Sequence, residues 1–160
     1  MQLCLVRHAI AVERSSAYID DRARPLTPEG RKRMAEAAVG LKKLFPAHEI
    51  FSSPLLRARQ TAEILSDAYG LKVNLLDGLG NGDHFAALSG CRSVRDAAIL
   101  VGHEPWMSEL LSLLLTGNAT EVGSVFKKGA AACVSLEGEI APGGGVLEWM
   151  AQPAMLRRLG

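Results

Sequence analysis

The chain has 160 residues, of which 48% are apolar and 22% charged, and its formal net charge is +1. This composition favours one folded domain over residues 1–160 and excludes a disordered chain. The near-neutral net charge produces no overall electrostatic attraction for nucleic acid or an anionic membrane surface, so we expect neither as a partner. No apolar stretch approaches the ~20 residues that cross a bilayer, and the first apolar run is too short for a signal peptide.

The three cysteines, Cys4, Cys91 and Cys133, are odd in number and lack metal-site spacing. Cys4 and Cys133 fall within apolar, strand-like runs. We therefore predict buried thiols in a reducing compartment, and hence a cytoplasmic protein. No additional apolar segment requires a second copy, so we expect a monomer.

The first predicted strand covers residues 3–6 and ends abruptly at Arg7 and His8. A short, continuous apolar run is typical of a strand covered on both faces. Because strand side chains alternate between faces, these two polar groups can share a site only where the strand becomes a loop. The carboxyl ends of parallel strands are where open α/β sheets bind ligands. There a guanidinium suits phosphate, and a neutral imidazole offers a nucleophilic nitrogen.

A polar loop over residues 13–24 leads to a predicted helix over about 28–44. Thr27 supplies a capping hydroxyl, Pro28 suits the first helical position, and Glu29 lies near the positive end of the dipole. An apolar stripe with helical spacing then continues to Pro46, which ends the pattern.

Residues 49–51 form the second predicted strand, and Ser53 can cap a helix that begins at Pro54 and ends at Gly70. Arg57 lies about one turn inside this helix. Its long side chain can reach back to the helix amino terminus, where free amides favour an anion. Ser52, Ser53 and Arg57 therefore form a second group directed at an anion.

Residues 72–76 form the third predicted strand, and Asp77 follows it in an irregular, glycine-rich loop. A short helix is expected over 85–88. The fourth strand, 97–101, breaks at Gly102 and His103, where the glycine would let the backbone approach a ligand. His103 repeats the placement of His8, and Pro105 opens the next helix.

Two further strands, 131–136 and 146–150, have no helix between them and are expected to pair antiparallel at a sheet edge. The four earlier strands alternate with loops or helices. Together they predict a three-layer α/β/α fold with a mostly parallel central sheet, antiparallel edge strands and helices on both faces. The side chains that follow the parallel strands should converge at one edge; they are Arg7, His8, Ser53, Arg57, Asp77 and His103.

With these residues, the chain resembles the histidine phosphatase superfamily, whose fold is shared with the phosphoglycerate mutases. Leu-Val-Arg-His-Ala at 5–9 is similar to the family's Arg-His-Gly hallmark, with Ala9 in place of the usual glycine. Within the superfamily the chain is most similar to the short SixA-type phosphohistidine phosphatases. The matching stretches are 24–30, 52–61, 101–105 and 126–130.

The resemblance implies that His8 is the phosphorylated nucleophile and that Arg7, Arg57 and His103 hold the phosphoryl oxygens. Arg24 is a further candidate contact near the pocket mouth. The methyl group of Ala9 should cause slight crowding without loss of chemistry.

The mechanism requires a neutral His8 with one ring nitrogen held by an acceptor, so that the other faces phosphorus. Cationic groups then stabilise charge on the transferring phosphoryl group, and water resolves the phosphohistidine. We therefore expect neither a metal nor a cofactor.

Asp77 occupies the position where relatives acting on esters carry their general acid, although it could equally cap the glycine-rich loop. Asp83 is a weaker candidate for the same role, and His84 could line the pocket edge. A phosphohistidine needs little acid help, because its leaving imidazole has an ordinary pKa near ~6.5.

Roughly twenty residues separate the third and fourth strands, which leaves little chain for a lid. An open site favours a phosphorylated protein substrate of the histidine phosphotransfer type, and thus a role in signal transduction. The alternative is a small-molecule phosphomonoesterase of the same fold. Two other hypotheses are a non-catalytic phosphate-binding module and a metal site at His8 and His103, which the neighbouring cations oppose.

Overall fold

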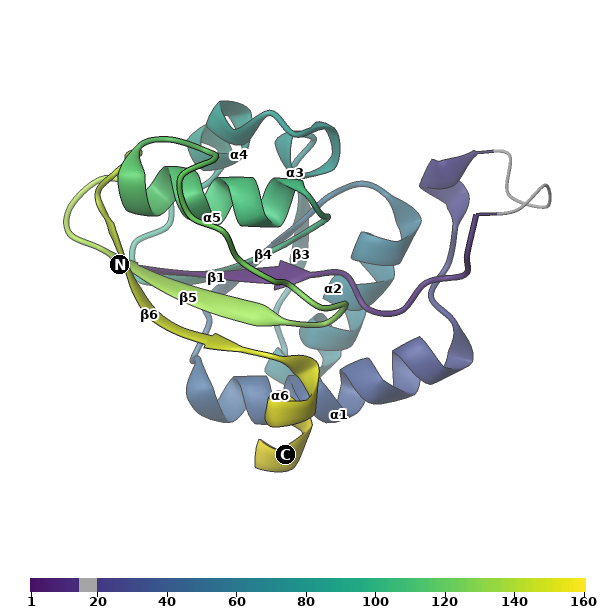
Figure 1. The fold of residues 1–160 in the computed structure, drawn as a ribbon. Coiled ribbons are helices and arrows are strands. Elements are labelled where there is room, and N and C mark those ends of the chain that lie inside the picture. Colours follow the sequence, from purple (N-terminus) through teal and green to yellow (C-terminus); the bar gives the residue numbers. More distant parts are fainter. Residues whose placement is uncertain (15–19) are drawn as a thin grey trace.

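A computed structural model describes residues 1–14 and 20–160. Its strands and helices alternate over most of the chain, as Figure 1 shows. The strands are β1 (Gln2–Arg7), β2 (Glu49–Ser52), β3 (Val73–Leu75), β4 (Ala97–Gly102), β5 (Ala131–Leu136) and β6 (Gly145–Ala151). The helices are η1 (Asp21–Ala23, a 3-10 turn), α1 (Pro28–Leu44), α2 (Leu56–Tyr69), α3 (Gly78–Asn81), α4 (His84–Gly90), α5 (Trp106–Thr116) and α6 (Pro153–Leu159).

The six strands form one sheet in the order β3-β2-β4-β1-β5-β6. The first four in this order are parallel, whereas β5 pairs antiparallel with both β1 and β6. The register places Arg7 beside Gly102 and Ser52 beside Val101, so β1, β2 and β4 end at the same edge. The predicted mixed sheet, with its antiparallel strands at one side, is confirmed.

Helices cover both faces of the sheet, with α1, α2 and α6 on one face and α3, α4 and α5 on the other (Figure 1). Successive residues of β1 point to opposite faces: Cys4 packs in the core beneath α1, α2 and α6, and Leu5 packs in the core beneath α3, α4 and α5. All four apolar residues of β1 are inaccessible to solvent. This confirms the predicted strand covered on both faces and the three-layer α/β/α fold.

The predicted helix over 28–44 is confirmed at both ends, and Thr27 Oγ1 caps it by accepting from the Gly30 amide at 2.9 Å. The next helix starts two residues later than we expected. Leu55 has extended backbone (φ −68°, ψ 137°), and its carbonyl accepts the first helical bonds. Ser53 Oγ instead accepts from the Leu55 amide at 3.2 Å, within the turn before the helix.

Besides the 3-10 turn η1, two short helices are absent from the sequence prediction. α3 lies in the loop that we expected to be irregular, where a Cβ on Gly80 would come within 2.8 Å of Ser53 Oγ. α6 packs on α1, where a Cβ on Gly40 would lie 1.9 Å from the Leu156 carbonyl oxygen. In both places glycine permits a close approach between elements, which local sequence does not reveal.

All three cysteines are free and buried, as predicted. Burial raises the pKa of Cys4 well above its ordinary value, that of Cys91 to about 12 and that of Cys133 to about 11. These thiols are therefore protonated and unreactive at neutral pH. Across residues 1–14 and 20–160, every helix is too short or too polar to cross a bilayer.

Candidate active site

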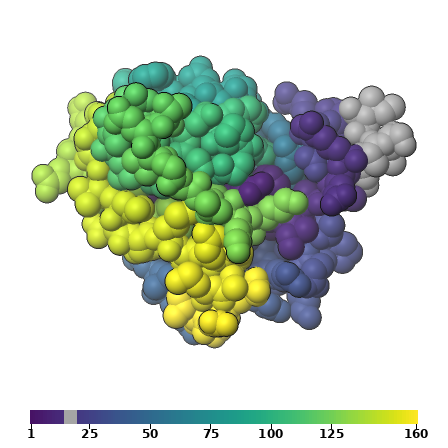
Figure 2. Space-filling view, in the orientation of Figure 1, coloured from purple at the N-terminus to yellow at the C-terminus, as the bar shows by residue number. Residues whose placement is uncertain are grey.

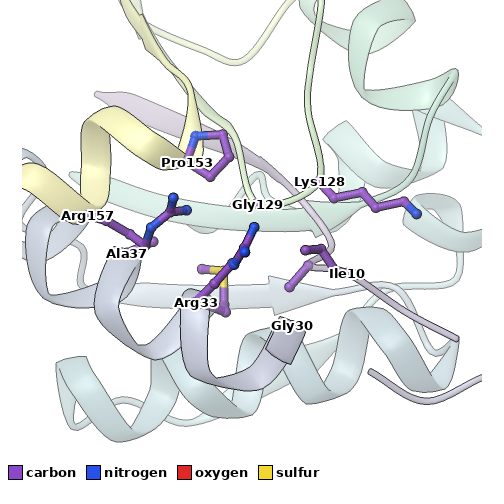
Figure 3. A pocket seen from close by; sticks show the side chains of 10 residues that line it. Ile10, Gly30, Arg33, Ala37, Lys128, Gly129, Pro153 and Arg157 are labelled. Carbon is purple, nitrogen blue, oxygen red and sulfur yellow. The ribbon is translucent and has the colours of Figure 1, made fainter. Parts of the chain in front are cut away.

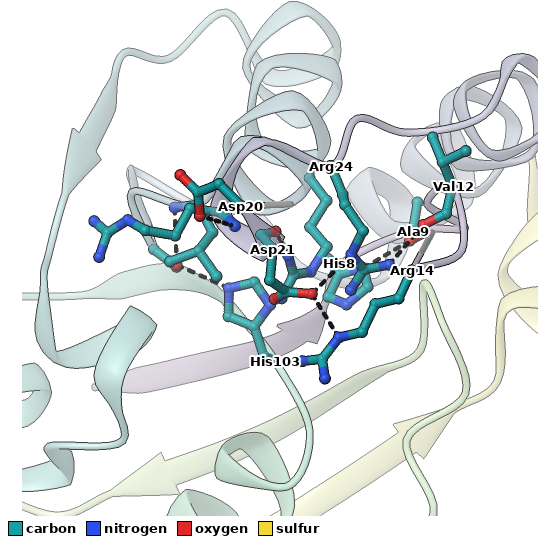
Figure 4. Close-up of polar contacts among 12 residues, drawn as sticks. His8, Ala9, Val12, Arg14, Asp20, Asp21, Arg24 and His103 are labelled. Carbon is teal, nitrogen blue, oxygen red and sulfur yellow. Dashed lines mark hydrogen bonds and ion pairs between the residues drawn. The ribbon is translucent and has the colours of Figure 1, made fainter. Parts of the chain in front are cut away.

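The carboxyl ends of the parallel strands bring two imidazoles together. His8 follows β1 and His103 follows β4, and their ring centroids are 5.1 Å apart. Arg57, from the first turn of α2, adjoins them and is only 6% exposed. Figure 4 shows the polar contacts around the two histidines. Of the six side chains expected to converge, His8, Arg57 and His103 therefore lie together, and Arg7 is close enough for its charge to act on His8.

His8 is held in the tautomer that nucleophilic attack requires. Its Nδ1 lies 2.7 Å from the Ala9 carbonyl oxygen. Because a carbonyl only accepts, Nδ1 carries the proton and the lone pair of Nε2 is free. Burial lowers the pKa of His8 to about 3; the Ala9 bond opposes this shift, and the charges of Arg57, Arg7 and Lys128 reinforce it. His8 is therefore neutral at physiological pH.

Three neighbouring segments fix the backbone around His8. Its amide donates to the Gly102 carbonyl of β4 at 2.9 Å, and the Gly129 amide donates to the His8 carbonyl at 3.2 Å. The next amide, of Ala9, donates to Thr61 Oγ1 at 3.0 Å, and this hydroxyl donates to the Arg57 carbonyl at 2.7 Å. In Figure 2 the green segment before β5 reaches the purple residues that follow β1.

Both arginines leave one edge of the guanidinium available. Arg7 Nη1 donates to the Phe126 carbonyl at 2.6 Å, whereas its buried Nε has no partner. Arg57 donates through Nη1 and Nη2 to Asp21, and its buried Nε likewise has no partner within residues 1–14 and 20–160. Buried donors without acceptors are rare in folded proteins. An oxyanion placed beside His8 would satisfy them, since guanidinium groups bind phosphate through such paired edges.

His103 offers a third unpartnered donor. Its Nε2 lies 2.8 Å from Ser53 Oγ, while its Nδ1 is buried without a partner. Ser53 Oγ accepts from the Leu55 amide, so its own proton can go to Nε2, which leaves the ring proton on Nδ1. Burial lowers the pKa of His103 to about 3, with His8 and Arg57 adding to the shift. Trp106 packs edge-on against this ring at 6.0 Å.

Arg24 lies near the site, and two of its guanidinium nitrogens are engaged within the chain. Its Nε donates to Asp21 Oδ1 at 2.8 Å and its Nη1 to the Val12 carbonyl at 2.6 Å. Ser53 contacts His103 rather than presenting a free hydroxyl. Met107 fills the space beside Gly102, and its Cε would lie 2.4 Å from an added Cβ. The glycine therefore makes room for the Met107 side chain. The phosphate-binding roles of these residues stay predictions.

Asp77 is not brought to the two histidines by any contact in the described part of the chain. Its side chain is exposed, does not cap α3, and lines a surface hollow with Arg22 and Asn81. Asp83 caps α4 through the Ala86 amide at 2.9 Å. His84 pairs with a glutamate of α5 at 3.0 Å.

Sequence reasoning missed two carboxylates beside the site. Asp21 contacts Arg57 directly, but it lies in a loop with no pattern that indicates a partner 36 residues away. Glu104 follows His103; its Oε2 accepts from Ser108 at 2.7 Å and its buried Oε1 has no partner. Burial lowers the pKa of Arg7, and the charge of Glu104 raises it. The adjacency of Glu104 to His103 was a signal that could have found it.

Residues 1–14 and 20–160 contain no group of three His, Cys, Asp or Glu side chains arranged to hold a metal ion. The donors that converge beside His8 are instead cations and neutral N–H groups. Such a set suits a tetrahedral anion.

The comparisons with known proteins agree with this geometry. The profile of the histidine phosphatase superfamily (branch 1) matches residues 3–84. An uncharacterized protein of Picosynechococcus sp. is 40% identical over 124 residues, which cover 73% of this chain and 74% of that protein. The chain belongs to the histidine phosphatase superfamily.

Solved structures extend the match over the whole fold. The protein histidine phosphatase SixA, complexed with tungstate, superposes with a TM-score of 0.80 at 25% identity, covering 96% of this chain and 98% of that one. A phosphoserine phosphatase variant from Entamoeba histolytica, in complex with phosphoserine, has a TM-score of 0.70 at 18% identity, covering 97% and 98%. At 18% identity, the similarity to the phosphoserine phosphatase is evidence of a shared fold only. The predicted SixA-like, phosphoglycerate mutase-like fold is confirmed, and family and site together support a phosphatase.

Proposed function

We propose that this chain is a phosphohistidine phosphatase acting on a phosphorylated protein of the histidine phosphotransfer type. The observation that carries the proposal is His8, whose Nε2 lone pair is free while Nδ1 is tied to the Ala9 carbonyl at 2.7 Å. Arg7, Arg57 and His103, which neighbour His8, each carry a buried nitrogen without a partner among the described residues.

The reaction proceeds in two displacements. His8 Nε2 attacks phosphorus, and the nitrogen–phosphorus bond to the substrate imidazole breaks, with the electron pair leaving on that imidazole. The other ring nitrogen of the substrate carries a proton, so the ring leaves as a neutral imidazole, and the proton that the attacking water later loses goes to solvent. Water then attacks the phosphorus on His8, releases inorganic phosphate and returns the neutral ring. In both steps the arginine Nε–H groups and His103 Nδ1–H stabilise charge on the phosphoryl oxygens.

The protonation of the leaving group favours phosphohistidine over an alkyl ester. An alkoxide needs a general acid, but Asp77 is exposed and makes no contact with His8. Asp21, although close, cannot donate a proton. Burial alone would raise its pKa, but hydrogen bonds from Arg14 and Arg24 and the charge of Arg57 lower it to about 2. An imidazole leaving group, with an ordinary pKa of ~6.5, does not need such an acid.

A hollow next to the site supports a protein substrate. It starts at Ala9, directly after the nucleophile, and its rim carries Lys128, Arg33 and Arg157 above an apolar floor (Figure 3). The positive charge of Lys128 also reaches His8. A cationic rim beside an apolar floor is suited to the surface of a protein with acidic side chains around its phosphohistidine.

The second candidate, a small-molecule phosphomonoesterase, is favoured by Glu104. Its buried Oε1 has no partner in the described part of the chain and the residue follows His103 directly, so its carboxyl is a candidate acid for an alkoxide. A Glu104→Gln variant separates the two candidates. It should slow hydrolysis of phosphoserine and leave phosphohistidine turnover within about twofold, because a general acid matters only for the basic leaving group.

The decisive assay compares kcat/KM for a phosphorylated histidine phosphotransfer domain with that for phosphoserine and for p-nitrophenyl phosphate. We expect the phosphohistidine substrate to exceed phosphoserine by about 10² or more, the factor that a general acid supplies. His8→Ala should abolish turnover, whereas His48→Ala, a matched surface control, should retain it. Labelled phosphate should stay on the enzyme in alkali and be lost in acid.

Two results would contradict the proposal. Faster turnover of phosphoserine than of the phosphorylated protein would make the chain a phosphomonoesterase. Binding of either substrate without phosphate release would indicate a non-catalytic module.

A further inference from the structure

Asp21, at the start of η1, holds three guanidinium groups on one carboxylate. Its Oδ1 accepts from Arg14 Nε and Arg24 Nε, each at 2.8 Å, and its Oδ2 accepts from Arg57 Nη2 at 3.0 Å. The dashed lines in Figure 4 show the bonds to Arg14 and Arg24. We call Arg14, Arg24 and Arg57 the arginine cluster.

The contact with Arg57 uses only one end of the guanidinium. Nη1 donates to the Asp21 backbone carbonyl at 2.8 Å, and Nη2 donates to the carboxylate. These bonds engage the terminal edge and leave the side edge, Nε–H with the second hydrogen of Nη2, available; its Nε is buried and has no partner among the described residues. Arg7 is arranged in the same way, with Nη1 tied to a carbonyl and Nε unpartnered.

The three members of the arginine cluster differ in exposure. The side chains of Arg57 and Arg24 are 7% and 13% exposed, and that of Arg14 is 79% exposed. The two buried guanidinium groups repel each other, since the charge of Arg24 lowers the pKa of Arg57 while that of Asp21 raises it, both acting beside the larger effect of burial. A shared carboxylate allows two like charges to stay close at the edge of the site.

We infer that Asp21 is a positioning residue that fixes Arg57 by its terminal edge, so that the side edge of the guanidinium stays aimed at the phosphoryl group beside His8. This inference rests on the proposed function only in requiring that the site binds a phosphoryl group. Asp21 itself does not touch the substrate. It acts by holding a long, flexible side chain in its binding geometry before the ligand arrives.

The test is binding of inorganic phosphate, measured by calorimetry at pH 7.5, to the wild type and to Asp21→Ala. Loss of a positioned donor should raise the Kd about tenfold or more. The matched control is Asp20→Ala, because Asp20 caps the same 3-10 turn through the Arg22 amide but contacts no guanidinium. Its Kd should stay within about twofold of the wild-type value.

A double-mutant cycle distinguishes positioning from a general structural role. In an Arg57→Ala background, Asp21→Ala should cause no further weakening, because the residue it positions is gone. Additive losses would overturn the inference. So would tighter phosphate binding by Asp21→Ala, since that result would mean that the carboxylate only opposes the anion.

A second variant covers the case in which Asp21→Ala does not fold, as judged by circular dichroism. Asp21→Asn keeps an oxygen acceptor for one guanidinium and should bind phosphate between the wild type and Arg57→Ala. Wild-type affinity in Asp21→Asn would overturn the inference. The outcome is separate from the proposed function: a wild type that binds phosphate but does not hydrolyse phosphohistidine disproves only the latter. Wild type without phosphate affinity would disprove both.

Discussion

Acid should destabilise the fold through two buried imidazoles, His8 and His103. Each is neutral in the folded protein, where its pKa is about 3. In the unfolded chain an imidazole has a pKa near ~6.5. Between pH 3 and pH ~6.5 the unfolded state binds protons that the folded state does not bind. The contribution of the two neutral imidazoles to the free energy of unfolding is therefore fully present above pH ~6.5 and is lost as the pH falls toward 3.

The size of the effect follows from the two titration curves. Lowering the pH from 7.5 to 5.5 should cost about 1.4 kcal/mol for each imidazole, and about 2.7 kcal/mol for both. The two rings are 6% and 2% exposed, so solvent screening takes little from these figures. Carboxylates contribute little between pH 7.5 and 5.5, because the ordinary pKa values of Asp and Glu lie below this range.

The measurement is urea unfolding at pH 7.5 and 5.5 in phosphate-free buffers, followed by circular dichroism and extrapolated to water. Phosphate is omitted because an anion that binds only the folded state would add stability. His8→Gln and His103→Gln should each remove about half of the pH-dependent loss. His48→Gln, whose side chain is 61% exposed in the wild type, should keep all of it. An unchanged loss in both buried variants would refute the reasoning.

Three further substitutions test the supports of the site. Arg7→Ala removes one unpartnered Nε and should lower kcat/KM by ~10²–10³, measured with a phosphorylated substrate. Thr61→Val leaves the buried Ala9 amide without its acceptor and should lower the free energy of unfolding by ~1–3 kcal/mol in urea. Gly30→Ala places a Cβ 2.1 Å from a backbone oxygen and should cost ~1–3 kcal/mol in thermal melts, whereas Gly123→Ala, with open space around it, should change little.

The main strands and helices were predictable because their signals are local. Thr27 and Pro28 mark the start of α1 on adjacent residues, and the structure begins the helix at Pro28. The apolar run before Arg7 indicated a buried strand, and β1 is one. The end of each such strand then located the histidines without any knowledge of long-range contacts.

The parts that sequence reasoning missed depend on contacts between distant residues. α3 contains two glycines in four residues, and its packing against Ser53 comes from a neighbouring turn. Asp21 meets Arg57 across 36 positions of the chain. Asp77 was selected because it follows a strand. That strand, β3, lies at one edge of the sheet, and β2 and β4 separate it from β1, which precedes His8.

The strand order also determines when the site can exist during synthesis. β1 leads to His8 and β2 leads to Arg57, yet these strands do not pair with each other, because β4 lies between them. A nascent chain that has emerged only through β3 therefore holds both residues without the strand that pairs with β1 and with β2. β4 occupies the place between them and leads to His103, so activity should arise only after β4 has been synthesised.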